Sequence, residues 1–190
     1  MHKIAVFASG SGSNARKIFE HFKDHPEISV TLLLSNKPNA PVMQHAKDMR
    51  IPALSFTRED LYENGRVLDL LREFKIDFIA LAGFLWLVPH SLTSAYPDRI
   101  VNIHPALLPK YGGKGMYGMN VHRAVKEAAE AVSGMTIHLV NEKYDEGKVL
   151  FQATTDLEPA DAPEDIAAKV LALEHRHYPQ VIQTYIENNL

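Results

Sequence analysis

Near its amino end the chain reads Lys3-Ile-Ala-Val-Phe-Ala-Ser-Gly-Ser-Gly-Ser-Asn14. The apolar run predicts a buried strand over 3–8, which the glycines at positions 10 and 12 bring to an end. Ser13 is a favoured N-cap residue and precedes apolar residues at helical spacing, so a helix is expected over 14–24. A strand, a glycine-rich turn and a helix in this order are typical of an α/β fold.

The same alternation continues along the rest of the chain. Apolar runs predict further strands near 28–34, 53–55, 77–82, 99–104, 134–140 and 148–155. Helices are expected near 41–49, 59–74 and 119–131, and a last one from Pro163 with Ile166, Val170, Leu173 and His177 on one face. We therefore predict a single α/β domain over 1–190: a mostly parallel, twisted sheet with helices on both faces, and antiparallel strands toward the carboxyl end. Ligands of such sheets bind beyond the carboxyl ends of the strands.

Composition limits the kinds of partner. Of the 190 residues 46% are hydrophobic and 23% are charged, the formal net charge is -3, and cysteine is absent. Without a basic run, a nucleic-acid or membrane-surface partner is disfavoured, and without cysteine there is no thiol nucleophile or thiolate metal site. No apolar stretch is long enough for a signal peptide or a membrane span, so a cytoplasmic protein is expected. No histidine pair has a convincing ligand spacing, so no metal is expected.

The glycine loop after the first strand has three interpretations. Glycines let a backbone approach a ligand, and free amides at a helix start attract an anion, so the loop is a candidate phosphate site. The plain alternative is a tight turn that binds nothing. Gly10-x-Gly12-x-x-Ala15 also fits the dinucleotide fingerprint, which needs an acid about 20 residues later. The chain has Ser35-Asn36-Lys37 there, which disfavours NAD and leaves an NADP-linked reductase as an alternative.

A second polar pair lies on a strand, in Val101-Asn102-Ile103-His104-Pro105. On a strand Asn102 and His104 share one face, and Pro105 ends the ladder directly after them. An amide beside an imidazole suits acyl transfer to an amine, because the amide can donate to an oxyanion while the imidazole moves protons. The histidine needs an acidic partner, and Asp145 in a turn between two predicted strands is one candidate among several.

Four blocks of sequence together resemble a known family. They are Gly12-Ser13-Asn14, Leu81-Ala82-Gly83-Phe84, Asn102-Ile103-His104-Pro105-Ala106-Leu107-Leu108-Pro109 and Asp145-Glu146-Gly147. Their order and spacing over nearly the whole chain resemble the formyltransferases that use 10-formyltetrahydrofolate, most closely those acting on glycinamide ribonucleotide in purine synthesis. The resemblance implies a Rossmann-like fold and formyl transfer from that folate co-substrate to the glycinamide amine, giving formylglycinamide ribonucleotide and tetrahydrofolate.

The resemblance also implies residue roles. Asn102 corresponds to the oxyanion donor, His104 to the general acid, and Asp145 to a carboxylate that raises the histidine pKa. The residues implied to bind the phosphorylated substrate are Gly12, Ser13, Asn14 and Glu174. The residues implied to bind the folate are Arg58, Leu85, Trp86, Leu87, Val88 and Asn102.

The sequence departs from this family's pattern in two places. Trp86 stands where many relatives have arginine, and the loop 111–118 is longer and richer in glycine than usual. That loop is either a flexible surface segment or a flap that brings Lys114 or His122 to the phosphate or ribose. His138 either faces the site or is a hydrogen-bonded core histidine.

Other functions are weighed against formyl transfer to glycinamide ribonucleotide. Within the family, transfer to initiator tRNA and formyltetrahydrofolate deformylation are disfavoured, because the chain has no additional tRNA-binding or regulatory domain. An NADP-linked reductase and a catalytically silent phosphate-binding module come from other classes. A monomer or a homodimer is equally compatible with the sequence.

Overall fold

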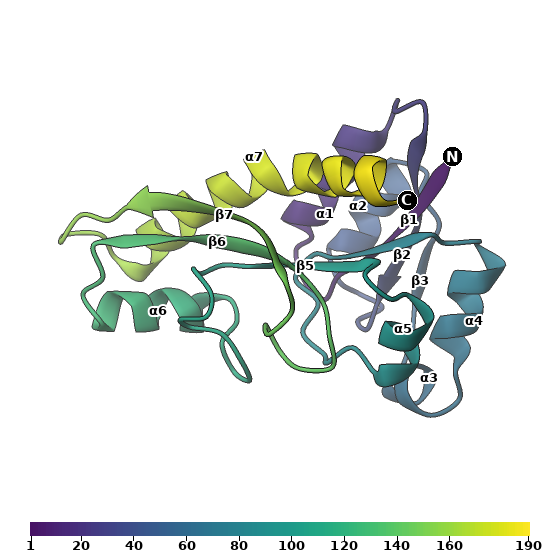
Figure 1. The fold of residues 1–190 in the computed structure, drawn as a ribbon, viewed down its shortest axis with the longest axis horizontal. Coiled ribbons are helices and arrows are strands. Elements are labelled where there is room, and N and C mark those ends of the chain that lie inside the picture. The colour runs from purple at the N-terminus through teal and green to yellow at the C-terminus, as the bar shows by residue number, and fades with distance from the viewer.

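The computed structural model describes all residues, 1–190, and is built on one seven-stranded sheet (Figure 1). The strands have the spatial order β3-β2-β1-β4-β5-β6-β7. Their bounds are β1 His2–Phe7, β2 Ile28–Ser35, β3 Ala53–Ser55, β4 Phe78–Leu81, β5 Ile100–His104, β6 Val132–Leu139 and β7 Val149–Asp156. The first five strands run parallel, whereas β6 pairs antiparallel with both β5 and β7.

Helices cover both faces of this sheet. One core packs against α1 (Ser13–Phe22), α2 (Val42–Asp48), α6 (Met119–Glu127) and α7 (Pro163–Asn189). The other packs against α3 (Arg58–Tyr62), α4 (Arg66–Glu73) and α5 (His90–Ala95). Alternation along β1 divides these cores, because Ile4 and Val6 enter the first while Ala5 and Phe7 enter the second. The predicted α/β class, the mostly parallel sheet, the helices on both faces and the antiparallel end are confirmed.

Three details of the predicted helices are wrong. Ser13 is not a cap but the first residue of α1; the N-cap is Gly12, which holds a left-handed backbone at φ 76°. The single helix expected over 59–74 is two helices, because Gly65 is also left-handed (φ 75°) and forms the N-cap of α4. The short helix α5 was not expected, since Leu92 is its one buried residue and gives no periodic pattern.

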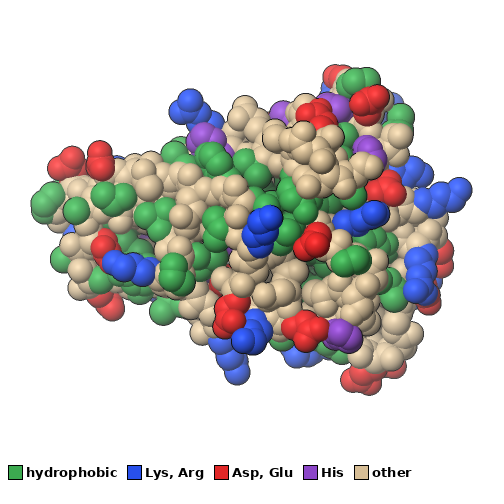
Figure 2. Space-filling model, viewed as in Figure 1, with side chains coloured by type: hydrophobic (Ala, Val, Ile, Leu, Met, Phe, Trp, Pro, Cys, Tyr) green, Lys and Arg blue, Asp and Glu red, His purple; other side chains and the backbone are tan.

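The long helix α7 buries part of the predicted face, since Ile166 and Val170 are buried as expected. Its buried side chains follow at steps of four: Ile166, Val170, Glu174, Tyr178, Ile182 and Ile186. Leu173 and His177 lie beside this row and are half-buried. The prediction is wrong at these two positions only, because a charged residue, Glu174, occupies the core position between them. No helix of the chain has both the length and the apolar character that a membrane span requires. On the face drawn in Figure 2, acidic and basic side chains are interspersed.

Candidate active site

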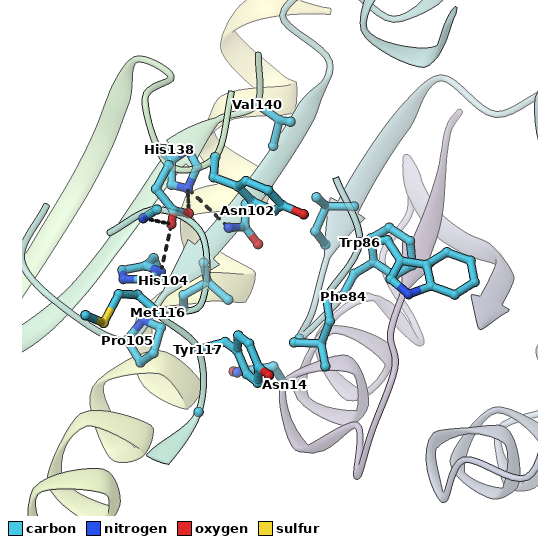
Figure 3. A pocket seen from close by; sticks show the side chains of 18 of the residues that line it. Asn14, Phe84, Trp86, Asn102, His104, Pro105, Met116, Tyr117, His138 and Val140 are labelled. Carbon is cyan, nitrogen blue, oxygen red and sulfur yellow. Dashed lines mark hydrogen bonds and ion pairs between the residues drawn. The ribbon is translucent and has the colours of Figure 1, made fainter. Parts of the chain in front are cut away.

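A cavity of about 780 Å³ opens where β1, β4 and β5 end (Figure 3). It is bordered by the loop before α1, the segment after β4, the end of β5, the glycine-rich loop 113–118, the loop after β6 and one side of α7. The sheet topology explains this convergence, because the carboxyl ends of parallel strands lie at one edge. Fourteen of the 31 lining residues are hydrophobic, so the cavity combines apolar walls with a smaller polar centre.

The polar centre brings together Asn102, His104 and Asp145. Asn102 and His104 lie near the carboxyl end of β5, and Val101 and Ile103 pack into the core on the opposite side. Asp145 reaches them from the loop between β6 and β7, and its Oδ2 lies 3.6 Å from His104 Nδ1. The aspartate side chain is only 11% exposed, so its charge acts with little screening by water.

His104 is buried and held at both ring nitrogens. Its Nε2 lies 2.7 Å from the Tyr111 carbonyl oxygen, which can only accept a hydrogen bond, so Nε2 carries a proton. Burial lowers the pKa of His104 below its ordinary value, although Asp145 and the Tyr111 carbonyl act to raise it. The influence of Asp145 on the His104 pKa has the expected sign, but desolvation outweighs it in the net shift. Burial thus opposes protonation of the imidazole, while the two oxygens that face its ring nitrogens favour it.

The charge of Asp145 is stabilised from three sides. Burial acts to raise the aspartate pKa, but His138, His104 and the Gly113 N–H hold it below the ordinary value. Gly113 N–H donates to Oδ2 at 2.8 Å, and His138 Nε2 lies 3.5 Å from Oδ1. The glycine-rich loop thus contacts the carboxylate through its backbone, which no side-chain pattern in the sequence reveals.

The opposing effects of burial and of Asp145 on the His104 pKa lead to a testable prediction. The pKa of His104 is expected to lie below the value of about 6.5 usual for histidine, and to fall further in Asp145→Asn, which removes the charge that opposes burial. Because the folded pKa is the lower one, this group costs stability as pH falls from the unfolded pKa toward the folded pKa. NMR titration of the ring resonances measures both midpoints; a higher midpoint in the variant would contradict this account.

The predicted substrate loop lies at one side of the cavity. Ser13 and Asn14 border it, whereas Gly12 does not, and acts through its backbone conformation instead. Asn14 Nδ2 donates to Glu174 Oε2 at 2.6 Å, which joins two predicted substrate residues that are 160 positions apart. Burial raises the pKa of Glu174, and the Asn14 hydrogen bond only partly opposes this. The pair fixes the orientation of the Asn14 amide at the start of α1.

The predicted folate segment lies after β4. Leu85, Trp86, Leu87 and Val88 all border the cavity. Arg58 is not a lining residue: its guanidinium lies over the Trp86 ring at 5.1 Å and over the Tyr62 ring at 5.3 Å. Arg58 can therefore affect a ligand here through Trp86, by holding the indole in place.

Two lining residues, Val140 and Asn141, were not singled out from the sequence. Phe84, Met116 and Tyr117 lie in segments named above and also border the cavity. Ser9 Oγ accepts a hydrogen bond from the Leu85 N–H at 3.2 Å, and so fastens the first glycine loop to the folate segment. No local motif predicts such contacts, because residues on neighbouring parallel strands have no fixed separation in the sequence.

The path of the loop 111–118 depends on the glycines at positions 113, 115 and 118, whose φ angles are positive. Lys114, in this loop, borders the cavity and has no ion-pair partner. His122, on α6, is buried at the cavity wall, where desolvation lowers its pKa. No group of three or more histidine, aspartate or glutamate side chains is arranged to hold a metal ion.

Comparisons with known proteins agree on one family. The model of the family described as formyl transferase matches residues 2–182. A Bacillus subtilis phosphoribosylglycinamide formyltransferase is 36% identical and is covered over 97% of its length, with all of this chain aligned. The Arabidopsis thaliana chloroplastic phosphoribosylglycinamide formyltransferase is 43% identical over 99% of this chain, which spans 66% of that relative. The crystal structure of glycinamide ribonucleotide transformylase 1 from Symbiobacterium toebii superposes with a TM-score of 0.91 at 31% identity, covering 100% of this chain and 90% of that one.

Proposed function

The chain belongs to the formyl transferase family, and from this membership we propose that it transfers the formyl group of 10-formyltetrahydrofolate to the amine of glycinamide ribonucleotide. One observation carries the proposal. A single cavity joins a glycine-rich helix start, a centre of Asn102, His104 and Asp145, and the segment 85–88. A phosphorylated amine and a folate can therefore meet with the acyl-transfer groups between them.

The reaction follows from the groups at the centre. The neutral amine attacks the formyl carbon, a carbon–nitrogen bond forms, and the carbonyl oxygen becomes an oxyanion that accepts a hydrogen bond from Asn102. His104 Nδ1 takes the proton that the amine loses and can then donate to the oxyanion, while Asp145 beside it stabilises the imidazolium. His104 then returns that proton to the folate nitrogen as the bond from carbon to that nitrogen breaks. No proton is gained or lost overall, and no metal enters the scheme.

Formyl transfer is favoured over the two main alternatives. For a reductase that uses NAD, an acid is needed at the end of β2 to hold the nucleotide ribose, and one that uses NADP is tested by the assay below. Ser35 stands there, fully buried, and its hydroxyl accepts a hydrogen bond from the Lys37 N–H at 3.1 Å. For a deformylase, water replaces the amine, so the acceptor has no phosphate for the glycine-rich loop to bind. In this chain Asn14 and Glu174 are hydrogen-bonded to each other at that loop.

One assay tests the proposal. The purified protein is mixed with glycinamide ribonucleotide and 10-formyltetrahydrofolate, and formylated product and tetrahydrofolate are measured together. Equal amounts of both are expected. Formate release without acceptor identifies a deformylase, turnover only with NADPH identifies a reductase, and no product with any of these refutes the proposal.

Lys114 is expected to contribute to binding of the acceptor phosphate. Two lysines border the cavity, and Lys143 is paired with Glu146 at 3.1 Å while Lys114 is free. Lys114→Ala should raise the KM for glycinamide ribonucleotide about tenfold with kcat little changed, since the charge holds ground state and transition state alike. Steady-state kinetics measures this, with Lys143→Ala as the matched control. The prediction fails if Lys143→Ala has the larger effect.

Three further expectations belong to this proposal: residues 1–190 as one domain, a cytoplasmic location, and a monomer or homodimer without nucleic-acid or membrane partners. The Arabidopsis relative is named as chloroplastic, so location differs among relatives. Light scattering coupled to size-exclusion chromatography measures the oligomeric state of the purified chain.

A further inference from the structure

Tyr111 holds the histidine of the polar centre through its backbone. Its carbonyl oxygen lies 2.7 Å from Nε2 of His104, which is 4% exposed at the end of β5 and lies at the cavity wall (Figure 3). A carbonyl can only accept a hydrogen bond, so Nε2 keeps its proton while Nδ1 of the same ring faces Asp145. A shift of the Tyr111 carbonyl would therefore turn the ring and move Nδ1, the nitrogen that is proposed to carry the proton.

The backbone around Tyr111 has little support of its own. The segment 110–112 belongs to no helix or strand, and none of its residues takes part in a backbone–backbone hydrogen bond of ordinary geometry. Tyr111 also has a left-handed φ of 56°, which is unfavourable for a residue with a β-carbon. Such a conformation persists only where the surrounding contacts fix it.

Two side chains of this segment are fixed by one carboxylate. The Tyr111 hydroxyl donates to Oε1 of Glu130 at 2.9 Å, and Nζ of Lys110 donates to the same oxygen at 2.8 Å. Glu130 lies between the end of α6 and the start of β6, and its own N–H donates to the Val125 carbonyl at 3.4 Å. The carboxylate thus connects the segment that holds His104 to a helix and a strand.

Close packing does not replace this hydrogen bond. Tyr111, Glu130 and Lys110 all border a second cavity, of about 230 Å³. A ring beside a cavity is less restrained than one in a close-packed core, so its hydroxyl contact determines more of its position. The Lys110 side chain is 68% exposed, and an ion pair as exposed as this one contributes little. The bond from Tyr111 to Glu130 is therefore the contact that can fix the carbonyl.

We propose that Glu130 is a positioning residue for formyl transfer, which holds the Tyr111 hydroxyl and so keeps the Tyr111 carbonyl on Nε2 of His104. Glu130 borders the second cavity and not the one proposed for the substrates, so it acts through Tyr111. The inference rests on the proposed function, because that reaction needs the His104 ring in one orientation. Both hydrogen bonds end on Oε1, so one acceptor oxygen at this place is sufficient.

Three substitutions separate this role from the charge of Glu130. Glu130→Ala removes the acceptor, Tyr111→Phe removes the donor, and Glu130→Gln keeps an amide oxygen that can accept from the hydroxyl. We expect the first two to lower kcat about three- to tenfold with KM values within about twofold, and Glu130→Gln to stay within about twofold of the parent kcat. Lys110→Met is the matched control: it removes the exposed partner of the same oxygen and should leave kcat nearly unchanged.

A double variant completes the kinetic test. Tyr111→Phe combined with Glu130→Ala should lower kcat no further than either change alone, because both break one hydrogen bond. Losses that multiply in the double variant, a loss confined to KM, or equal losses in Glu130→Gln and Glu130→Ala would overturn the proposal. Thermal unfolding shows whether a loss of kcat reflects lost folded protein. If Tyr111→Phe does not fold, the comparison of the two Glu130 variants decides alone.

Proton NMR of the ligand-free protein tests the contact without any substrate. The Nε2–H of His104 should exchange slowly with water in the parent and in Glu130→Gln, and about tenfold faster in Glu130→Ala and Tyr111→Phe. Equal exchange rates in all four proteins would refute the inference. If the parent protein formed no formylated product, the proposed function would fail, while this measurement would still decide whether Glu130 holds the ring.

Discussion

Asp145→Asn is expected to lower kcat by about 10²–10⁴-fold while the fold stays intact. The substitution removes the charge that stabilises a protonated His104, whose Nδ1 lies 3.6 Å from the carboxylate. Burial already disfavours the imidazolium, so without Asp145 the histidine is a poor acceptor for the proton of the attacking amine. Asparagine has nearly the same volume, and its oxygen can still accept the hydrogen bond from Gly113.

Single-turnover kinetics with both substrates bound measures this effect, and thermal unfolding measures the fold. Glu146→Gln is the matched control: it removes the neighbouring carboxylate, which is 61% exposed and paired with Lys143 on the surface. That control should retain nearly full kcat, because an exposed pair contributes little. Near-normal turnover in Asp145→Asn would show that another group stabilises the imidazolium.

Gly12→Ala is expected to lower both the stability of the fold and the binding of the acceptor. Gly12 is left-handed at φ 76°, a conformation that costs an alanine about 1–2 kcal/mol. An added Cβ would also lie 2.3 Å from Val42 Cγ2 and 3.0 Å from Val42 Cα, and the backbone atom cannot move aside cheaply. Together we expect unfolding free energy to fall by about 2–4 kcal/mol.

The same change should raise the KM for glycinamide ribonucleotide more than tenfold, since Ser13 and Asn14 follow directly and take their direction from this turn. Gly10→Ala is the control for stability. An added Cβ there has no atom within 4 Å and the backbone is not left-handed, so unfolding free energy should change by less than about 1 kcal/mol. Chemical denaturation of both variants gives the comparison, and equal losses would contradict the role assigned to Gly12.

The sequence was most informative where function follows local geometry. Alternation in 101–105 placed Asn102 and His104 on one face of a strand, and Pro105 placed that strand's end beside them. Apolar runs gave the strands, since burial of a parallel sheet is recorded directly in continuous hydrophobic sequence. The helix over 59–74 failed at Gly65, because one left-handed residue breaks a helix without changing the average pattern.

By contrast, everything that depends on distance in space came from the tertiary structure. Asn14 and Glu174 are 160 positions apart, and Asp145 reaches His104 from a loop that follows another strand. The family resemblance named Asp145, but the sequence had no means to show that it also contacts His138.

The sequence by itself thus determined the α/β class, the two polar residues at the end of β5, and the glycine turn before α1. Only the tertiary structure decided that His104 has a lowered pKa, that Gly12 is needed for its φ, and that His138 faces Asn102. The physical reason is that side-chain periodicity records the geometry of one element. Desolvation and contact between elements depend instead on how all of them pack around the cavity.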